Sequence, residues 1–236
     1  MKIPAKKQRK GFTLIELLTV IAIIGILAGL ASAGIPMAMN AANQMSASSN
    51  LRSIAQAVVN LRNEGKIINN NGSDAKKYQA TTVAGYAEVL ARYTSVNTGK
   101  TWVVGSDEDG YSSGIPQHVL SEIDDGTNEL DGNAISWDVV VNARKNPKDA
   151  TGYPLAWLRG LQTSGEWDDD SPFGKSVGMI AFADGHVKKV TNLLSDEDQL
   201  SSYDGKTQTS SYLDAIGANT GGSAKKPTVL QGQSAN

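Results

Sequence analysis

The residue of this sequence that most clearly calls for a chemical role is Glu16. It is the only charged residue between positions 11 and 50. A carboxylate near the start of a membrane helix is costly, so it usually has a function and a partner. A cut between Gly11 and Phe12 would place a new α-amino group one helical turn from Glu16. A cationic terminus on a neighbouring subunit could then neutralise this carboxylate.

The residues needed for catalysis are sparse. The two histidines are His118 and His186, and Asp184 beside His186 is needed in a tight Asp-Gly turn. The sequence has no phosphate-binding or dinucleotide-binding glycine loop and no H-E-x-x-H. A zinc site would need three or four ligands. We therefore expect a protein that is not an enzyme and has no certain cofactor.

The four tryptophans could form a carbohydrate-binding face or pack in a core; they are Trp102, Trp137, Trp157 and Trp167. Their spacing is irregular, and three lie in predicted strands, where aromatic residues normally pack inward. We expect a core role.

Charge is distributed unevenly along the chain. The net charge is −2, but five of the 22 basic residues lie within the first ten positions, which leaves 17 basic and 24 acidic residues in the remainder. This balance gives no support for nucleic-acid binding. The absence of cysteine excludes disulfides and Cys-ligated metals.

An apolar segment follows the basic leader. About 20 apolar residues can cross a bilayer as one helix, and the preceding basic residues predict that the leader stays cytoplasmic. A secretory signal cleaved near Ala31-Ser32-Ala33 and a plain membrane anchor are the alternatives. Neither alternative explains Glu16.

The stretch from Lys10 to Leu17, KGFTLIEL, resembles the processing signal of type IV pilins and type II secretion pseudopilins. The resemblance implies cleavage after Gly11 by a prepilin peptidase, N-methylation of Phe12 and a role for Glu16 in assembly. It also implies that the apolar helices form a filament core. Pro36 departs from the family pattern, because the helix-distorting proline of family members commonly lies earlier.

The resemblance also implies a location and partners. We expect a single-pass protein of the inner membrane with its head in the periplasm or outside. The expected partners are copies of itself, other pilin-like subunits, the prepilin peptidase and methylase, the inner-membrane assembly platform and the lipid bilayer, but no nucleic acid. Whether the filament is a pseudopilus or a pilus stays open. The alternative function is an extracytoplasmic binding protein, membrane-anchored or secreted, that does not assemble.

Calcium is a possible ligand of the acidic loops, because carboxylates in glycine-rich loops suit this ion. The candidates are Asp107, Asp109, Asp124, Asp125 and Asp131. Major pseudopilins bind calcium in such loops, so the resemblance implies that this chain could bind calcium there as well. No stretch matches the twelve-residue calcium loop, and solvated acidic loops are the alternative.

A second resemblance lies near the C-terminus. Residues 182–187, FADGHV, are similar to the DGHV signature of pilin-like proteins with an H-x9-DG pattern. The pattern is broken, because Gly174 stands where the histidine is expected.

The expected fold is α+β, pilin-like, with a long N-terminal helix packed on a small antiparallel-sheet head. The expected divisions are a leader (1–11), a transmembrane and assembly helix (12–36), an amphipathic continuation (37–64), a head (65–217) and a flexible tail (218–236).

Within the head, periodicity predicts a helix over 82–93 and strands over 101–104, 134–142 and 153–157. A hairpin of 177–183 and 186–190 is expected around a two-residue Asp-Gly turn with two positive φ angles. A short helix is expected to start near 195–199.

Overall fold

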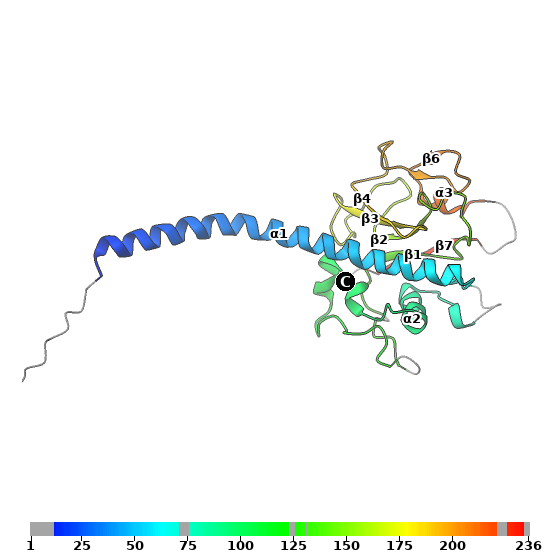
Figure 1. Ribbon diagram of the computed structural model, residues 1–236, viewed down its shortest axis with the longest axis horizontal. Coiled ribbons are helices and arrows are strands. Elements are labelled where there is room, and N and C mark those ends of the chain that lie inside the picture. Colours follow the sequence, from blue (N-terminus) through cyan, green and yellow to red (C-terminus); the bar gives the residue numbers. More distant parts are fainter. Residues whose placement is uncertain (1–11, 71–75, 123–125, 131, 221–225, 234–236) are drawn as a thin grey trace, which may run out of the picture. The chain divides into compact units, whose positions relative to one another are not determined.

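The computed structural model describes residues 12–70, 76–122, 126–130, 132–220 and 226–233. The chain divides into two compact units, Met1–Asn43 and Gln44–Asn236. Helix α1 (Leu14–Asn63) begins in the first unit and ends in the second, as predicted for residues 12–64 (Figure 1).

In the first unit, α1 is apolar and its large side chains are exposed, for example Ile15, Ile24 and Leu30. Pro36 lies inside the helix, and the helix continues past it. Among the described residues, α1 is the one helix long and apolar enough to cross a membrane.

In the second unit, α1 buries one stripe of its surface. Its buried residues include Leu51, Ile54, Ala55, Val58 and Leu61, which recur every three or four positions, as predicted. The helix ends where Gly65 adopts a φ of 80°. The Gly65 N–H donates to the Arg62 carbonyl, and the Lys66 N–H donates to the Leu61 carbonyl. These two hydrogen bonds form a Schellman motif.

The second helix is α2 (Val83–Tyr93). It begins at the expected place because the Thr82 hydroxyl accepts a hydrogen bond of 3.0 Å from the Gly85 N–H. Its buried face includes Val83, Tyr86 and Leu90, and it packs against the sheet at β1.

The main sheet is antiparallel and has five strands in the order β4-β3-β2-β1-β7 (Figure 1). The strands are β1 (Trp137–Val141), β2 (Pro154–Leu158), β3 (Gly178–Phe182), β4 (Val187–Val190) and β7 (Thr228–Leu230). All residues of β1, β2 and β3 are buried, so these strands are covered on both faces. The α+β class and the strands predicted within 134–142 and 153–157 are confirmed.

Smaller elements complete the second unit. They are η1 (Lys76–Tyr78), η2 (Gly99–Thr101), η3 (Gly105–Gly110), β5 (Leu200–Ser201), β6 (Gln208–Thr209) and α3 (Tyr212–Ile216). Strands β5 and β6 form a separate two-stranded sheet, and α3 packs against β2.

The β3–β4 hairpin is confirmed, but its turn differs from the prediction. Ala181 pairs with Val187, and the Phe182 N–H donates to the His186 carbonyl, so three residues form the loop. Only Gly185 has a positive φ, 90°. The Gly185 N–H also donates to the Phe182 carbonyl. The loop is therefore a turn followed by a glycine bulge.

Three other predictions were wrong. Residues 101–104 form the end of η2 and irregular chain instead of a strand. Residues 195–199 make a single turn closed on the Ser195 carbonyl. The segment predicted as a flexible tail (218–236) contains β7, which pairs with β1. In each case tertiary contacts override a weak local pattern.

The tryptophans are buried, as expected. Trp102, Trp137 and Trp157 are fully buried and Trp167 is 3% exposed. Each of them therefore fills the core of the second unit instead of presenting a flat binding face.

Replacing Gly178 by alanine is expected to destabilise the second unit, because the new Cβ would overlap the buried Trp167 indole. Overpacking of this kind costs about 1–3 kcal/mol. Thermal unfolding of the full chain in detergent, followed by tryptophan fluorescence, measures the loss. Gly29→Ala is the control, since its Cβ meets no atom within 4 Å. Equal melting temperatures for the two variants would contradict the close packing.

Candidate functional site

The first turn of α1 contains two residues singled out by sequence, Phe12 and Glu16, and one that was missed, Thr13. The Glu16 N–H donates to the Thr13 hydroxyl oxygen (3.3 Å). In return, Glu16 Oε2 accepts hydrogen bonds from the Thr13 N–H (2.8 Å) and the Thr13 hydroxyl (2.7 Å). This reciprocal pattern is a capping box. The Thr-x-x-Glu spacing was a signal that sequence reasoning could have used.

The capping box uses one carboxylate oxygen of Glu16 and leaves the charge of the group unbalanced. Oε2 takes both Thr13 donors, while no described residue donates to Oε1. The next basic residue along the described chain after Phe12 is Arg52. Phe12 itself is 80% exposed at the start of the chain described, and Gly11 lies outside the described residues. The turn can therefore accept a cation at Oε1 without losing its cap.

The apolar surface of the first unit extends along α1 from this turn. It is defined here by the exposed large side chains between Leu14 and Met39. Such a surface is far larger than the single exposed apolar residues normal for soluble proteins, and it marks contact with lipid or with other protein. Its burial would provide a strong drive for insertion or for assembly.

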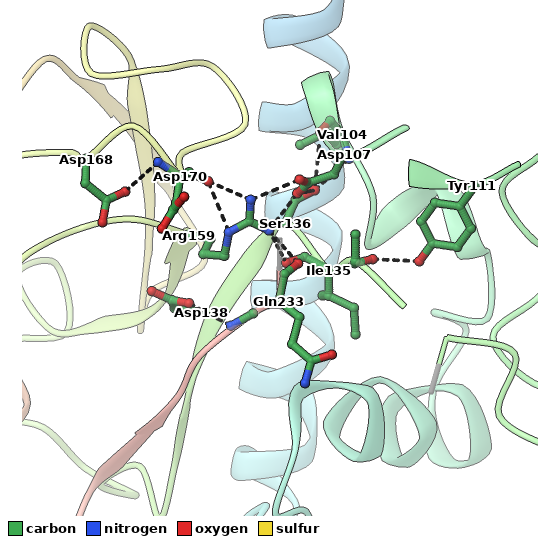
Figure 2. Close-up of polar contacts among 12 residues, drawn as sticks. Val104, Asp107, Tyr111, Ile135, Ser136, Asp138, Arg159, Asp168, Asp170 and Gln233 are labelled. Atoms are coloured by element: carbon green, nitrogen blue, oxygen red, sulfur yellow. Dashed lines mark hydrogen bonds and ion pairs between the residues drawn. The ribbon is translucent and has the colours of Figure 1, made fainter. Parts of the chain in front are cut away.

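One calcium candidate has a structural role in the second unit. Asp107 is 2% exposed and forms a two-pronged ion pair with Arg159, at 2.8 Å from Nη1 to Oδ2 and 2.9 Å from Nη2 to Oδ1 (Figure 2). The Ser136 hydroxyl also donates to Asp107 Oδ2 (2.8 Å). Asp107 is therefore committed to protein donors.

The other calcium candidates are not brought together by the described structure. Asp109 is exposed, whereas Asp124, Asp125 and Asp131 lie outside the described residues. Among the residues described, no three histidine or acidic side chains form a cluster that could hold a metal ion. Calcium binding stays a prediction.

Arg159 contacts four separate parts of the chain, and nothing in its sequence context predicted this. Besides Asp107, its guanidinium donates to the carbonyls of Ile135 (3.0 Å), Gln233 (2.6 Å) and Asp170 (2.6 Å), as Figure 2 shows. A buried charge is tolerated when its donors are filled in this way. The cluster holds the C-terminal segment against the start of β1.

Asp138 is the second contact with the C-terminal segment. Its Oδ1 accepts a hydrogen bond from the Gly232 N–H (2.9 Å) and its Oδ2 one from Trp157 Nε1 (3.1 Å). Burial raises the pKa of Asp138 to about 7, although both hydrogen bonds and the Arg159 charge favour the ionised form. Asp138 thus lies buried at the point where β7 joins the sheet.

The histidines show no catalytic arrangement in the described structure. His186 Nδ1 lies 2.6 Å from Asp184 Oδ1, and its ring stacks on Phe182 at 4.4 Å between centroids. These contacts stabilise the hairpin loop. His118 is exposed on a loop and pairs with Thr98 through an isolated bridge.

Comparison with known proteins gives one finding. The family described as the prokaryotic N-terminal methylation motif matches residues 6–32, a range that includes Phe12, Glu16 and most of the apolar part of α1. Neither the curated proteins nor the solved structures contain a match to this chain.

The raised pKa of Asp138 predicts a pH-dependent stability. Between about pH 4 and pH 7 the folded carboxyl stays protonated while the unfolded one ionises, so stability falls as pH rises. The free energy of unfolding changes by at most about 1.4 kcal/mol per pH unit from this group, and the change ends above the pKa of the folded state. Melting curves across this range should show that Asp138→Asn removes the slope. Asp109→Asn, at an exposed carboxylate, should retain it; parallel curves for wild type and Asp138→Asn would contradict the assignment.

Proposed function

We propose that this chain is a pilin-like subunit, cut by a prepilin peptidase between Gly11 and Phe12 and assembled into a type II secretion pseudopilus or a type IV pilus-like filament. The N-terminal methylation motif at residues 6–32 carries the proposal. Proteins with this motif are structural subunits, and the α+β fold with its long N-terminal helix is pilin-like.

The first step in the proposed mechanism is the creation of a cation. Cleavage releases the α-amino group of Phe12, which is then N-methylated and stays protonated at neutral pH. In the membrane, this ammonium group of one subunit binds Oε1 of Glu16 on a neighbour. The Thr13 donors keep Oε2 occupied, so the cap and the intersubunit ion pair coexist. Opposite charges attract strongly at low dielectric, which favours one register between adjacent helices.

The second step is burial of the apolar surface. Subunits wait in the bilayer with the side chains between Leu14 and Met39 facing lipid. In the filament these side chains pack against those of neighbouring helices. Lipid tails are as apolar as these side chains, so the transfer from bilayer to filament relies on packing and on the Glu16 pairing. We assign the energy for extraction to a separate cytoplasmic ATPase, because this sequence has no nucleotide-binding motif.

The type of filament is the finer part of the proposal. An acidic second unit without cysteine favours a secretion pseudopilus over a surface pilus. The alternative function is a membrane-anchored or secreted binding protein that does not assemble. It requires neither the cut before Phe12 nor a partner for Glu16, and the tryptophans that would have served it are buried.

The processing step is tested by mass spectrometry of the intact protein extracted from membranes. The expected mature chain starts at Phe12 and carries one extra methyl group. A chain that keeps residues of the leader would favour a plain anchor. A chain that starts after Ala33 would identify a secreted protein and would remove the basis for assembly.

The assembly step is tested by Glu16→Ala, which is expected to leave membrane insertion unchanged and to reduce filament yield at least tenfold, measured by shearing and immunoblotting. Glu16→Gln separates the two roles of this residue, because its amide oxygen can still accept the Thr13 hydrogen bonds but has no charge. It should assemble as poorly as Glu16→Ala. Thr13→Ser, which keeps the hydroxyl, is the control. Normal yield from Glu16→Gln would eliminate the charge-pairing mechanism.

A further inference from the structure

Arg62 is a buried cation without an anionic partner among the described residues. It lies in the last turn of α1 and is 6% exposed. Its Nη2 donates to the Ala183 carbonyl at 2.6 Å, whereas Nε and Nη1 are buried and have no acceptor. No carboxylate of the described residues forms an ion pair with it. This contrasts with Arg159, whose guanidinium is paired with Asp107 and three carbonyls.

Arg62 lines a small cavity. Its volume is about 10 Å³, close to the minimum that admits one water-sized particle. Tyr86 also lines it, fully buried, with a hydroxyl that has no hydrogen-bond partner. The other lining side chains are hydrocarbon, except that of Lys66, whose ammonium group is hydrogen-bonded to Glu64. The lining therefore offers donors and positive charge, and no carboxylate.

The physical cost of this arrangement indicates what should fill the cavity. A buried charge without a counter-ion strongly destabilises the folded state. A water molecule could accept hydrogen bonds from Arg62 but would leave the charge unbalanced. A monovalent anion satisfies the donors and balances the charge together. A cavity of this size suits a single-atom anion better than sulfate, phosphate or a carboxylate.

We propose that this cavity binds a single halide ion, chloride under ordinary conditions, held by Nε–H and Nη1–H of Arg62 and the hydroxyl of Tyr86. Arg62 belongs to α1 and Tyr86 to α2, and Arg62 also holds the β3–β4 loop through the Ala183 carbonyl. The ion thus links α1, α2 and the hairpin. The proposal concerns the second unit alone and is independent of filament assembly.

Anion exchange tests the proposal on the full chain in non-ionic detergent. Thermal unfolding is followed by tryptophan fluorescence in sodium chloride and in sodium gluconate of equal ionic strength. Chloride should raise the melting temperature of the wild type by roughly 2–4 °C or more, with saturation. Bromide should replace chloride, and sulfate should not.

Variants assign the effect to the site. Arg62→Met and Tyr86→Phe should both lose the chloride dependence, whereas Arg52→Met, at an exposed position of the same helix, should keep it. Tyr86→Phe removes one hydroxyl and retains the ring that contacts Trp102 edge-on. This variant therefore tests the anion site even if Arg62→Met does not fold.

Chlorine NMR gives a direct readout. The chloride resonance should broaden with wild-type protein and with Arg52→Met, and the excess broadening should disappear with Tyr86→Phe. Equal melting temperatures of the wild type in chloride and gluconate would overturn the proposal and leave water as the occupant. A chloride effect that persists in Tyr86→Phe and Arg62→Met would place the ion elsewhere and would also overturn it.

Discussion

The constraint on which the second unit depends is that its central strands have no exposed face. Every residue of β1, β2 and β3 is buried, so the sheet requires apolar cover on both sides. Helix α2 packs on β1 and α3 on β2, and the stripe of α1 from Leu51 to Leu61 joins the same core. The helix that presents an apolar surface in the first unit is thus also a structural member of the second. One element serves two different environments.

Four buried charged side chains in this core avoid an unbalanced charge in three different ways. Asp107 and Arg159 neutralise each other and fill their remaining hydrogen bonds with a hydroxyl and with carbonyls. Asp138 has a pKa raised to about 7, so protonation can remove its charge. Arg62 has neither remedy, because a guanidinium does not lose its proton in proteins and no described carboxylate is paired with it. A small external anion would supply the counter-charge that the described residues do not.

The sequence predicted the parts of the fold in which local pattern and tertiary role agree. The apolar run and the stripe after it predicted α1, the helical periodicity of residues 82–93 predicted α2, and Asp-Gly predicted the hairpin. The predicted turn length was wrong because Asp184 does not adopt the positive φ that a two-residue turn requires. Strand β7 was missed because its partner, β1, lies far away in the chain. The pairing of Asp107 with Arg159 was equally hidden, since a separation of 52 residues leaves no periodic trace. Of the candidate site, Phe12 and Glu16 were predicted, and the role of Thr13 was not.

The position of β7 has a consequence for the order in which the chain can fold. Strand β1 obtains its second neighbour only from residues 228–230, and Asp138 and Arg159 obtain partners from Gly232 and Gln233. Contacts between segments so distant form slowly, because a long loop must close first. In a chain synthesised from its N-terminal end, the sheet therefore remains open at β1 until the last segment has emerged. Completion of the sheet is a late event, and until then the unpaired edge of β1 is available to wrong partners.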